Sequence, residues 1–271
     1  MIAEETWRRY TAHWGALALA GLFATLVSLI VVVLGFILVV PVMISTGVSF
    51  ALLGADGGAA LASMATAGFG VLLLMLLAVV LVAPIAQGGL LHAVIQVQRD
   101  QPAAFGELWQ AGLRHWGRLF RLDLICAGIG LLSLPVLLIL TLVPFLGPAV
   151  WFFGMSMIML PLAGYGPYIA VSEETGAREA AGRAFRILSA KFADVLLTLL
   201  IFLAAFVVLS VVETVLSLVP GVRALVPWAV QIFVSPLIIL YLAVRYQRNI
   251  APDLGPPGGQ GSFYPGPPPG V

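Results

Sequence analysis

Charged residues and cysteine are scarce in this 271-residue sequence. Only 9% of the residues are charged, whereas soluble domains carry about 25%. A chain that is 61% hydrophobic cannot cover its own surface with polar groups, so that surface must face lipid. The single cysteine, Cys126, excludes an internal disulfide and any metal site built from several cysteines. The net charge of +1 gives no overall field that would favour nucleic acid.

The sequence also lacks a catalytic constellation. Glu173, Glu174 and Arg178 match the Glu-Glu-x-x-x-Arg pattern of intramembrane CAAX-type proteases, which also need histidines later in the chain. All three histidines precede this motif, and none follows Ser156 to activate it as a rhomboid-like serine. The sequence contains neither a glycine-rich phosphate loop nor a His-Glu-x-x-His motif. We therefore expect a protein without enzymatic activity, cofactor or metal.

Long uncharged stretches predict an all-α fold, a polytopic transmembrane helical bundle. A bilayer core about 30 Å thick needs roughly 20 apolar residues per helix. Turns rich in proline and glycine, such as Pro220-Gly221, separate stretches of this length. The six predicted spans lie within residues 15–45, 68–96, 122–143, 149–171, 195–217 and 225–244.

The distribution of basic residues predicts the orientation, because cytoplasmic loops retain lysine and arginine. If six spans leave both termini in the cytoplasm, all 13 basic residues except Arg223 lie on the cytoplasmic side. The loop at 46–67 on the far side carries only one charged residue, Asp56. We therefore expect an integral protein of the bacterial cytoplasmic membrane with both termini inside.

The last 21 residues, 251–271, differ in composition from the rest of the chain. Proline and glycine dominate this segment, which has too few apolar residues to bury a core. We expect a disordered cytoplasmic tail with local polyproline II structure. The transmembrane domain is accordingly assigned to residues 1–250.

A spacing of aromatic and basic residues occurs three times. Trp7, Trp109 and Phe185 are each followed six residues later by a basic, an aromatic and a small residue: His13-Trp14-Gly15, His115-Trp116-Gly117 and Lys191-Phe192-Ala193. In the even-numbered spans, residues 84–94 align without gaps on residues 161–171, and prolines at 84, 161 and 236 predict kinks. This pattern predicts three repeats, each an interfacial amphipathic helix followed by a helical hairpin. The alternative is chance similarity in a chain rich in glycine, alanine and valine.

The amphipathic segments at 103–121 and 176–192 are candidates for contact with lipid. In each, an aromatic and aliphatic face lies opposite a basic face. Such helices lie in the membrane interface, with the arginines toward anionic lipid. The alternative is that they only anchor and orient the hairpins. The candidate anionic-lipid contacts are Arg114, Arg118, Arg121, Arg183 and Arg186.

Polar residues within the predicted spans form a second candidate site, because ionisable groups inside a membrane are often functional. Glu213 lies near the outer end of the fifth span, where Arg223 could pair with it. Gln87 and His92 lie on the second span and Gln231 on the sixth. Isolated polar residues of this kind more often bridge helices than bind a ligand. If Glu213 met the other three in one cavity, they would line a path for a small solute.

The run from Tyr168 to Leu188 resembles a loop of uncharacterised bacterial multi-span families. These families are similar to the membrane domain associated with glycerophosphoryl diester phosphodiesterases. In them too, a span ends in an acid-rich turn and an alanine-rich amphipathic helix follows. Residues 89–113 look like that group's link between the second and third spans, and the resemblance covers most of residues 1–250. Members with phosphodiesterase activity carry it in a separate soluble domain, so the resemblance implies no catalytic residues here.

Two functions are compatible with these features. The first is a non-enzymatic membrane protein that binds lipid, particularly anionic lipid, or a protein partner through its cytoplasmic helices and thereby organises the membrane. The second is a permease or channel for a small solute, which requires a polar cavity between the spans.

Overall fold

The computed structural model describes residues 2–30, 33, 37, 57–217 and 225–254. Helices dominate these residues and no strand occurs among them, which confirms the all-α fold class. The helices in chain order are α1 (Ile2–Ala12), the helix Trp14–Ile30, α3 (Gly57–Gln98), α4 (Phe105–Leu140), α5 (Leu146–Met159), η1 (Leu160–Tyr165), α6 (Gly166–Ser172), α7 (Ala177–Ala190), α8 (Phe192–Ser217), α9 (Val226–Ala229), η2 (Val230–Val234), α10 (Ser235–Arg245), η3 (Tyr246–Ile250) and α11 (Ala251–Leu254).

The helical stretches confirm an architecture that can be integrated into a membrane. Five are long and apolar enough to span it, and a sixth is counted if α1 and the helix Trp14–Ile30 form one broken span. These two helices are bent by 84° at His13, the basic position of the first predicted repeat. The five stretches are Val80–Gln98, Phe105–Leu140, Leu146–Ser172, Phe192–Leu216 and Val226–Ile250.

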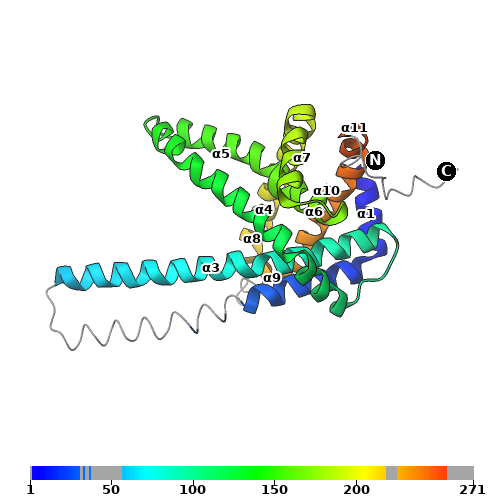
Figure 1. The fold of residues 1–271 in the computed structure, drawn as a ribbon, viewed down its shortest axis with the longest axis horizontal. Helices are drawn as coiled ribbons and strands as arrows, with labels where there is room; N and C mark the ends of the chain where they lie inside the picture. The colour runs from blue at the N-terminus through cyan, green and yellow to red at the C-terminus, as the bar shows by residue number, and fades with distance from the viewer. Residues whose placement is uncertain (1, 31–32, 34–36, 38–56, 218–224, 255–271) are drawn as a thin grey trace.

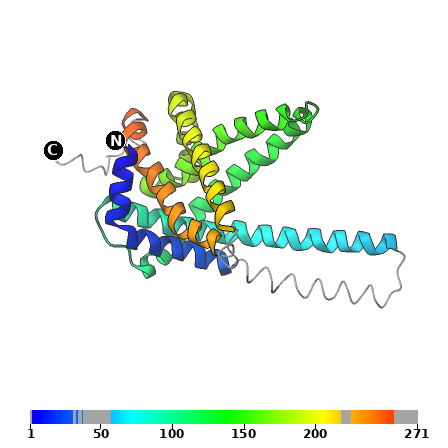
Figure 2. The same cartoon turned by 180° about the vertical axis from the view of Figure 1, so that it is seen from behind.

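The helices meet at the end of the molecule that carries the N-terminus, and the long helix α3 and the α4–α5 hairpin diverge from there (Figure 1). α10 lies beside α1 on the side behind α3 (Figure 2). The chain stays helical through α11, which occupies the first residues of the predicted tail. Residues 255–271 of that tail and the loop at 46–56 lie outside the described residues.

The predicted interfacial helix at 103–121 and the predicted span at 122–143 form one continuous helix. α4 runs without a break from Phe105 to Leu140, a length of about 54 Å at 1.5 Å per residue. Its first half lies on α3, where the indole of Trp116 donates a hydrogen bond to the carbonyl oxygen of Leu81 at 2.7 Å. The apolar face of this segment therefore packs in part on protein.

The threefold repeat stays a prediction. The first and third copies break at their basic residue, because α1 ends before His13 and α7 ends before Lys191. The middle copy has no break at His115, which lies inside α4. Two of the three prolines at which kinks are predicted lie at π-helical turns, since η1 contains Pro161 and η2 ends two residues before Pro236. The third, Pro84, lies inside the continuous helix α3.

Glycines allow α3 and α4 to approach each other closely. A Cβ atom on Gly88 would lie 3.0 Å from the Cα of Gly112, and a Cβ on Gly112 would lie 2.5 Å from the carbonyl oxygen of Ile85. Interfaces of small residues hold membrane helices together, because they bring the backbones into contact. This crossing fixes the position of the polar residues of α4 that follow Gly112.

Candidate functional site

A cavity of about 420 Å³ lies between the helices of the predicted membrane region. Its walls come from α3, α5, η1, α6, α8 and α10, and they include Leu160, Phe202 and Leu242. Gln87 and Ser156 supply its polar side chains. A lining of this kind suits an acyl chain better than a hydrated solute, because apolar walls cannot replace the solute's hydrogen bonds with water.

The structure does not bring the predicted intramembrane polar residues together. Only Gln87 lines this cavity. The imidazole of His92 lies 3.3 Å from the amide nitrogen of Gln96, one turn further along α3. The amide of Gln231 donates a hydrogen bond to Ser28 at 3.2 Å. The contact of Gln231 with Ser28 is the helix bridging that isolated polar residues in membranes often perform.

Glu213, the fourth of these residues, is exposed on α8. Its predicted partner Arg223 lies outside the described residues. The carboxylate does not line the cavity that contains Gln87. The four predicted residues are therefore not assembled into one polar site.

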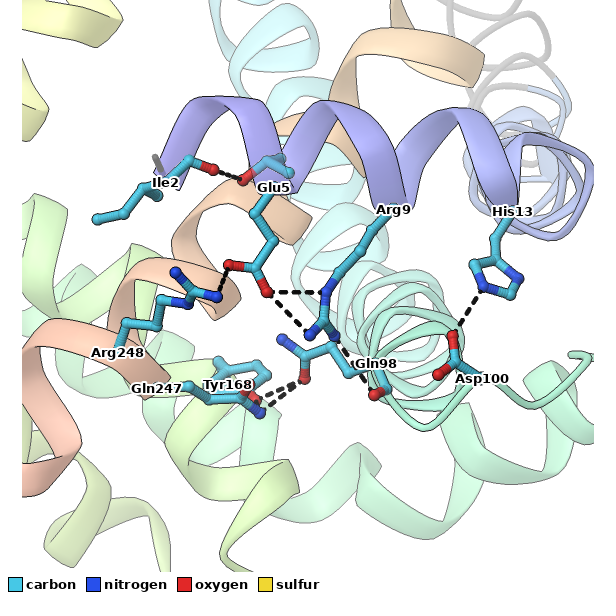
Figure 3. A network of polar contacts seen from close by, with 10 residues as sticks. Ile2, Glu5, Arg9, His13, Gln98, Asp100, Tyr168, Gln247 and Arg248 are labelled. Carbon is cyan, nitrogen blue, oxygen red and sulfur yellow. Dashed lines mark hydrogen bonds and ion pairs between the residues drawn. The ribbon is translucent and has the colours of Figure 1, made fainter. Parts of the chain in front are cut away.

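The second candidate site is the end of the molecule formed by residues 2–13, 96–121, 173–191 and 245–254, here called the basic face. Contacts between distant segments hold it together (Figure 3). The carboxylate of Glu5, which is 8% exposed, pairs with Arg9 at 2.9 Å and with Arg248 of η3. Arg9 also donates a hydrogen bond to the carbonyl oxygen of Gln98 at the end of α3. These contacts join α1, α3 and η3.

A neutral cluster continues this network toward α6. The hydroxyl of Tyr168 donates a hydrogen bond to the side-chain oxygen of Gln98 at 2.8 Å. The amide of Gln247 donates to the same oxygen at 2.9 Å and to the Tyr168 hydroxyl at 2.8 Å (Figure 3). At the edge of the network, His13 lies 3.1 Å from the carboxylate of Asp100. Segments that the charge distribution predicts on one side of the membrane are thus in direct contact.

Arg183 is buried, with only 2% of its surface exposed, so its predicted contact with lipid headgroups is wrong. Its guanidinium pairs with Glu173, which also accepts a hydrogen bond from the Tyr246 hydroxyl at 2.6 Å. The helical period correctly places Arg183 away from Phe185. However, no sequence pattern indicates that Glu173, which precedes α7, folds back and covers Arg183.

A second buried arginine, Arg245, was missed by the sequence reasoning. It is 3% exposed and donates hydrogen bonds to the carboxylate of Asp194 at 2.8 Å and to the hydroxyl of Tyr241 at 2.7 Å. Asp194 lies in the first turn of α8, and Arg245 is the last residue of α10. Opposite charges at the cytoplasmic ends of two predicted spans could therefore have indicated this ion pair. Buried pairs of this kind fix the arrangement of helices because breaking one leaves a charge without a partner.

Three of the predicted lipid-contacting arginines are exposed, namely Arg114, Arg121 and Arg186. Arg114 also donates a hydrogen bond to Glu174 at 3.1 Å. Arg118 is partly buried. Large exposed aromatic side chains occur in the same predicted amphipathic segments, namely Phe105, Trp109, Phe185 and Phe192. Exposed arginine beside exposed aromatic residues is typical of a surface in contact with lipid headgroups.

No protein-family model, curated protein or solved structure matches this chain. Within the described part of the chain, no group of three or more His, Cys, Asp or Glu side chains is placed to hold a metal ion. The two sites offered by the geometry are therefore the apolar cavity and the basic face.

Proposed function

We propose that this protein is a non-enzymatic component of the bacterial cytoplasmic membrane that binds anionic lipid through its basic face and organises lipid or a partner protein there. The observation that carries the proposal is the exposure of Arg114, Arg121 and Arg186 in segments that also expose Trp109 and Phe185. Aromatic rings favour the headgroup level and arginines attract acidic lipid. In this proposal the basic face is cytoplasmic, as the positive-inside rule predicts.

The expected strength follows from the charge of the exposed arginines. Each basic residue near an anionic surface contributes about 1 kcal/mol, and the contribution falls within a Debye length. Arg114 already pairs with Glu174, so Arg121 and Arg186 together would favour acidic over neutral lipid by about 2 kcal/mol, which is on the order of thirtyfold. Binding of this type weakens as salt is added.

The apolar cavity fits the same function, since the lining around Gln87 can accommodate an acyl chain more readily than a polar solute. A small-solute permease is less well supported, because Glu213, His92 and Gln231 do not line this cavity. The proposal includes membership of the families that are similar to the membrane domain associated with glycerophosphoryl diester phosphodiesterases. The resemblance to that domain likewise implies a lipid-facing protein without a catalytic centre.

The test compares lipid composition around the purified protein. The protein is reconstituted in phosphatidylcholine vesicles containing a minor fraction of phosphatidylglycerol, extracted in mild detergent, and analysed for retained lipid by mass spectrometry. We expect phosphatidylglycerol to be enriched, and charge reversal of all three exposed arginines, Arg114→Glu, Arg121→Glu and Arg186→Glu, to remove the enrichment. The matched control is Arg223→Glu, which lies on the opposite side of the predicted topology. If the triple variant still enriches phosphatidylglycerol, the proposal is wrong.

A further inference from the structure

A group of buried polar atoms lies where α4 meets the loop between α6 and α7. His115 is 6% exposed and Thr175 is 7% exposed. The Nδ1 atom of His115, the Oγ1 atom of Thr175 and the Nη1 atom of Arg118 are buried and have no hydrogen-bond partner among the residues that the structure describes. Buried polar atoms almost always have a partner, because leaving one unsatisfied is costly. Three such atoms in one region therefore point to a bound group that supplies the missing hydrogen bonds.

Contacts on both sides of Thr175 hold its loop against α4. On one side, the carboxylate of Glu174 accepts a hydrogen bond from Arg114 at 3.1 Å. On the other side, Ala177 belongs to the same buried apolar cluster as Leu122 of α4. His115 and Arg118 lie between Arg114 and Leu122 along the helix, so the loop that carries Thr175 runs beside the stretch of α4 that contains them.

The residues of α4 at this level are close neighbours. Arg118 follows His115 by three residues and Arg114 by four, and residues at these spacings adjoin on a helix surface. His115 interacts electrostatically with Arg118, Arg114, Glu174 and, from α3, His92. Cationic charge therefore exceeds anionic charge around the unpartnered atoms, since Glu174 is the only carboxylate in this set and already pairs with Arg114.

The chemistry of the unpartnered atoms identifies the class of ligand. A guanidinium is a donor only, a hydroxyl can donate, and an imidazole nitrogen donates in the appropriate tautomer. Arginine is especially suited to phosphate, whose oxygens accept charge-assisted hydrogen bonds in its fork geometry. A neutral apolar ligand would leave all three atoms without partners.

We propose that Arg118, His115 and Thr175 form a binding site for one phosphate group, carried by a phospholipid headgroup or present as free phosphate. This inference deepens the proposed lipid binding, and it rests on that proposal where the phosphate belongs to a lipid. It differs from attraction to the exposed arginines because it requires one tightly held group with a fixed stoichiometry.

Two variants test the site and one serves as a matched control. Thr175→Val removes the hydroxyl and keeps the shape, and Arg118→Gln removes the charge. Arg223→Gln removes the same charge on the opposite side of the predicted topology, where the basic face is not involved. We expect the site variants to lower affinity for the bound phosphate group by on the order of tenfold, and the control by about twofold or less.

Two probes separate the sources of phosphate. In the first arm, native mass spectrometry follows the last phosphatidylglycerol molecule retained as detergent is raised. In the second arm, delipidated protein is heated with inorganic phosphate or with chloride at equal ionic strength. Retention of one lipid that the site variants lose identifies a headgroup, whereas saturable stabilisation by phosphate that they lose identifies free phosphate. Either result supports the site.

The unfolding temperature of each variant without ligand distinguishes binding from a structural role. The Thr175 hydroxyl has no partner within the described part of the chain, so Thr175→Val should leave the lipid-free unfolding temperature unchanged or raise it. If phosphatidylglycerol is enriched but the site variants match Arg223→Gln in both arms, the phosphate site is refuted and surface lipid binding stands. If inorganic phosphate binds but phosphatidylglycerol is never enriched, the site stands and the proposed lipid function fails. If neither probe binds selectively, the unpartnered atoms are satisfied by water and both are refuted.

Discussion

The close crossing of α3 and α4 predicts that Gly112→Ala destabilises the protein. The added Cβ would lie 2.5 Å from the carbonyl oxygen of Ile85, about 0.9 Å inside the 3.4 Å at which ordinary contact begins. It would also lie 3.0 Å from the Cγ2 atom of the same residue. Because a backbone carbonyl cannot rotate away as a side chain can, the helices must separate. Overpacking of this kind costs about 1–3 kcal/mol.

The matched control is Gly117→Ala on the same helix, where a Cβ would have no neighbour within 4 Å. Replacing glycine by alanine inside a helix contributes about 0.5–1 kcal/mol of stability through backbone entropy. Both variants gain this contribution, so the difference between them isolates the clash at Gly112. We expect Gly117→Ala to be the more stable of the two by about 1–3 kcal/mol.

The assay is reversible unfolding in mixed micelles as the fraction of sodium dodecyl sulfate rises, followed by circular dichroism and tryptophan fluorescence. Trp116 reports on the crossing directly, since its indole is bonded to the carbonyl oxygen of Leu81. Equal stability of the two variants would show that α3 and α4 are further apart than the structure has them, and would refute the reasoning.

Three other perturbations probe the basic face and the cavity. Arg183→Gln should lower the unfolding free energy by about 3–5 kcal/mol, because it leaves the buried Glu173 carboxylate without its charge partner. Its control, Arg186→Gln at an exposed position, should change the unfolding free energy by about 0.5 kcal/mol or less. Equal effects of the two variants in the same unfolding assay would contradict this prediction. Glu5→Gln should speed hydrogen exchange in α1 while leaving α8 unchanged, since Glu5 ties α1 to η3; unchanged exchange in α1 would show that the pair does not hold the helix. Gln87→Leu should change the unfolding free energy by about 1 kcal/mol or less, and the variant should retain as much lipid as the wild type, because the cavity is apolar. A large loss of retained lipid would indicate that the Gln87 amide binds a polar group.

The spans could be predicted from the sequence because burial in lipid imposes a single requirement, a long run of apolar residues. The stretch Phe192–Leu216 meets this requirement, and it differs from the predicted span at 195–217 only in its end residues. The continuity of α4 across Arg121, and its packing on α3, could not be predicted for a physical reason. An amphipathic face has the same sequence period whether it meets lipid or another helix, and the glycine at 112 that allows α3 to approach is one among many.

The candidate site was less accessible to sequence reasoning. Arginines were assigned to lipid from their position on a helical face, where Arg186 is exposed but Arg183 is buried. The difference depends on Glu173, which lies outside α7 and reaches Arg183 only because of the turn at residues 173–176. The role of Thr175 could not be predicted from the sequence, because a single threonine in a loop is informative only when its burial is known.

The consecutive acids Glu173 and Glu174 show how this turn organises the basic face. Glu174 adopts a left-handed backbone conformation with φ of 52°, uncommon for a residue other than glycine. The reversal allows neighbouring carboxylates to reach different elements, since Glu173 bonds to Arg183 and Tyr246 while Glu174 bonds to Arg114. Both acids of the protease-like motif are therefore engaged in contacts that hold the turn. Thr175 is fixed between these contacts and α4, so the phosphate site that we propose is built by the same residues that join α4, α7 and η3.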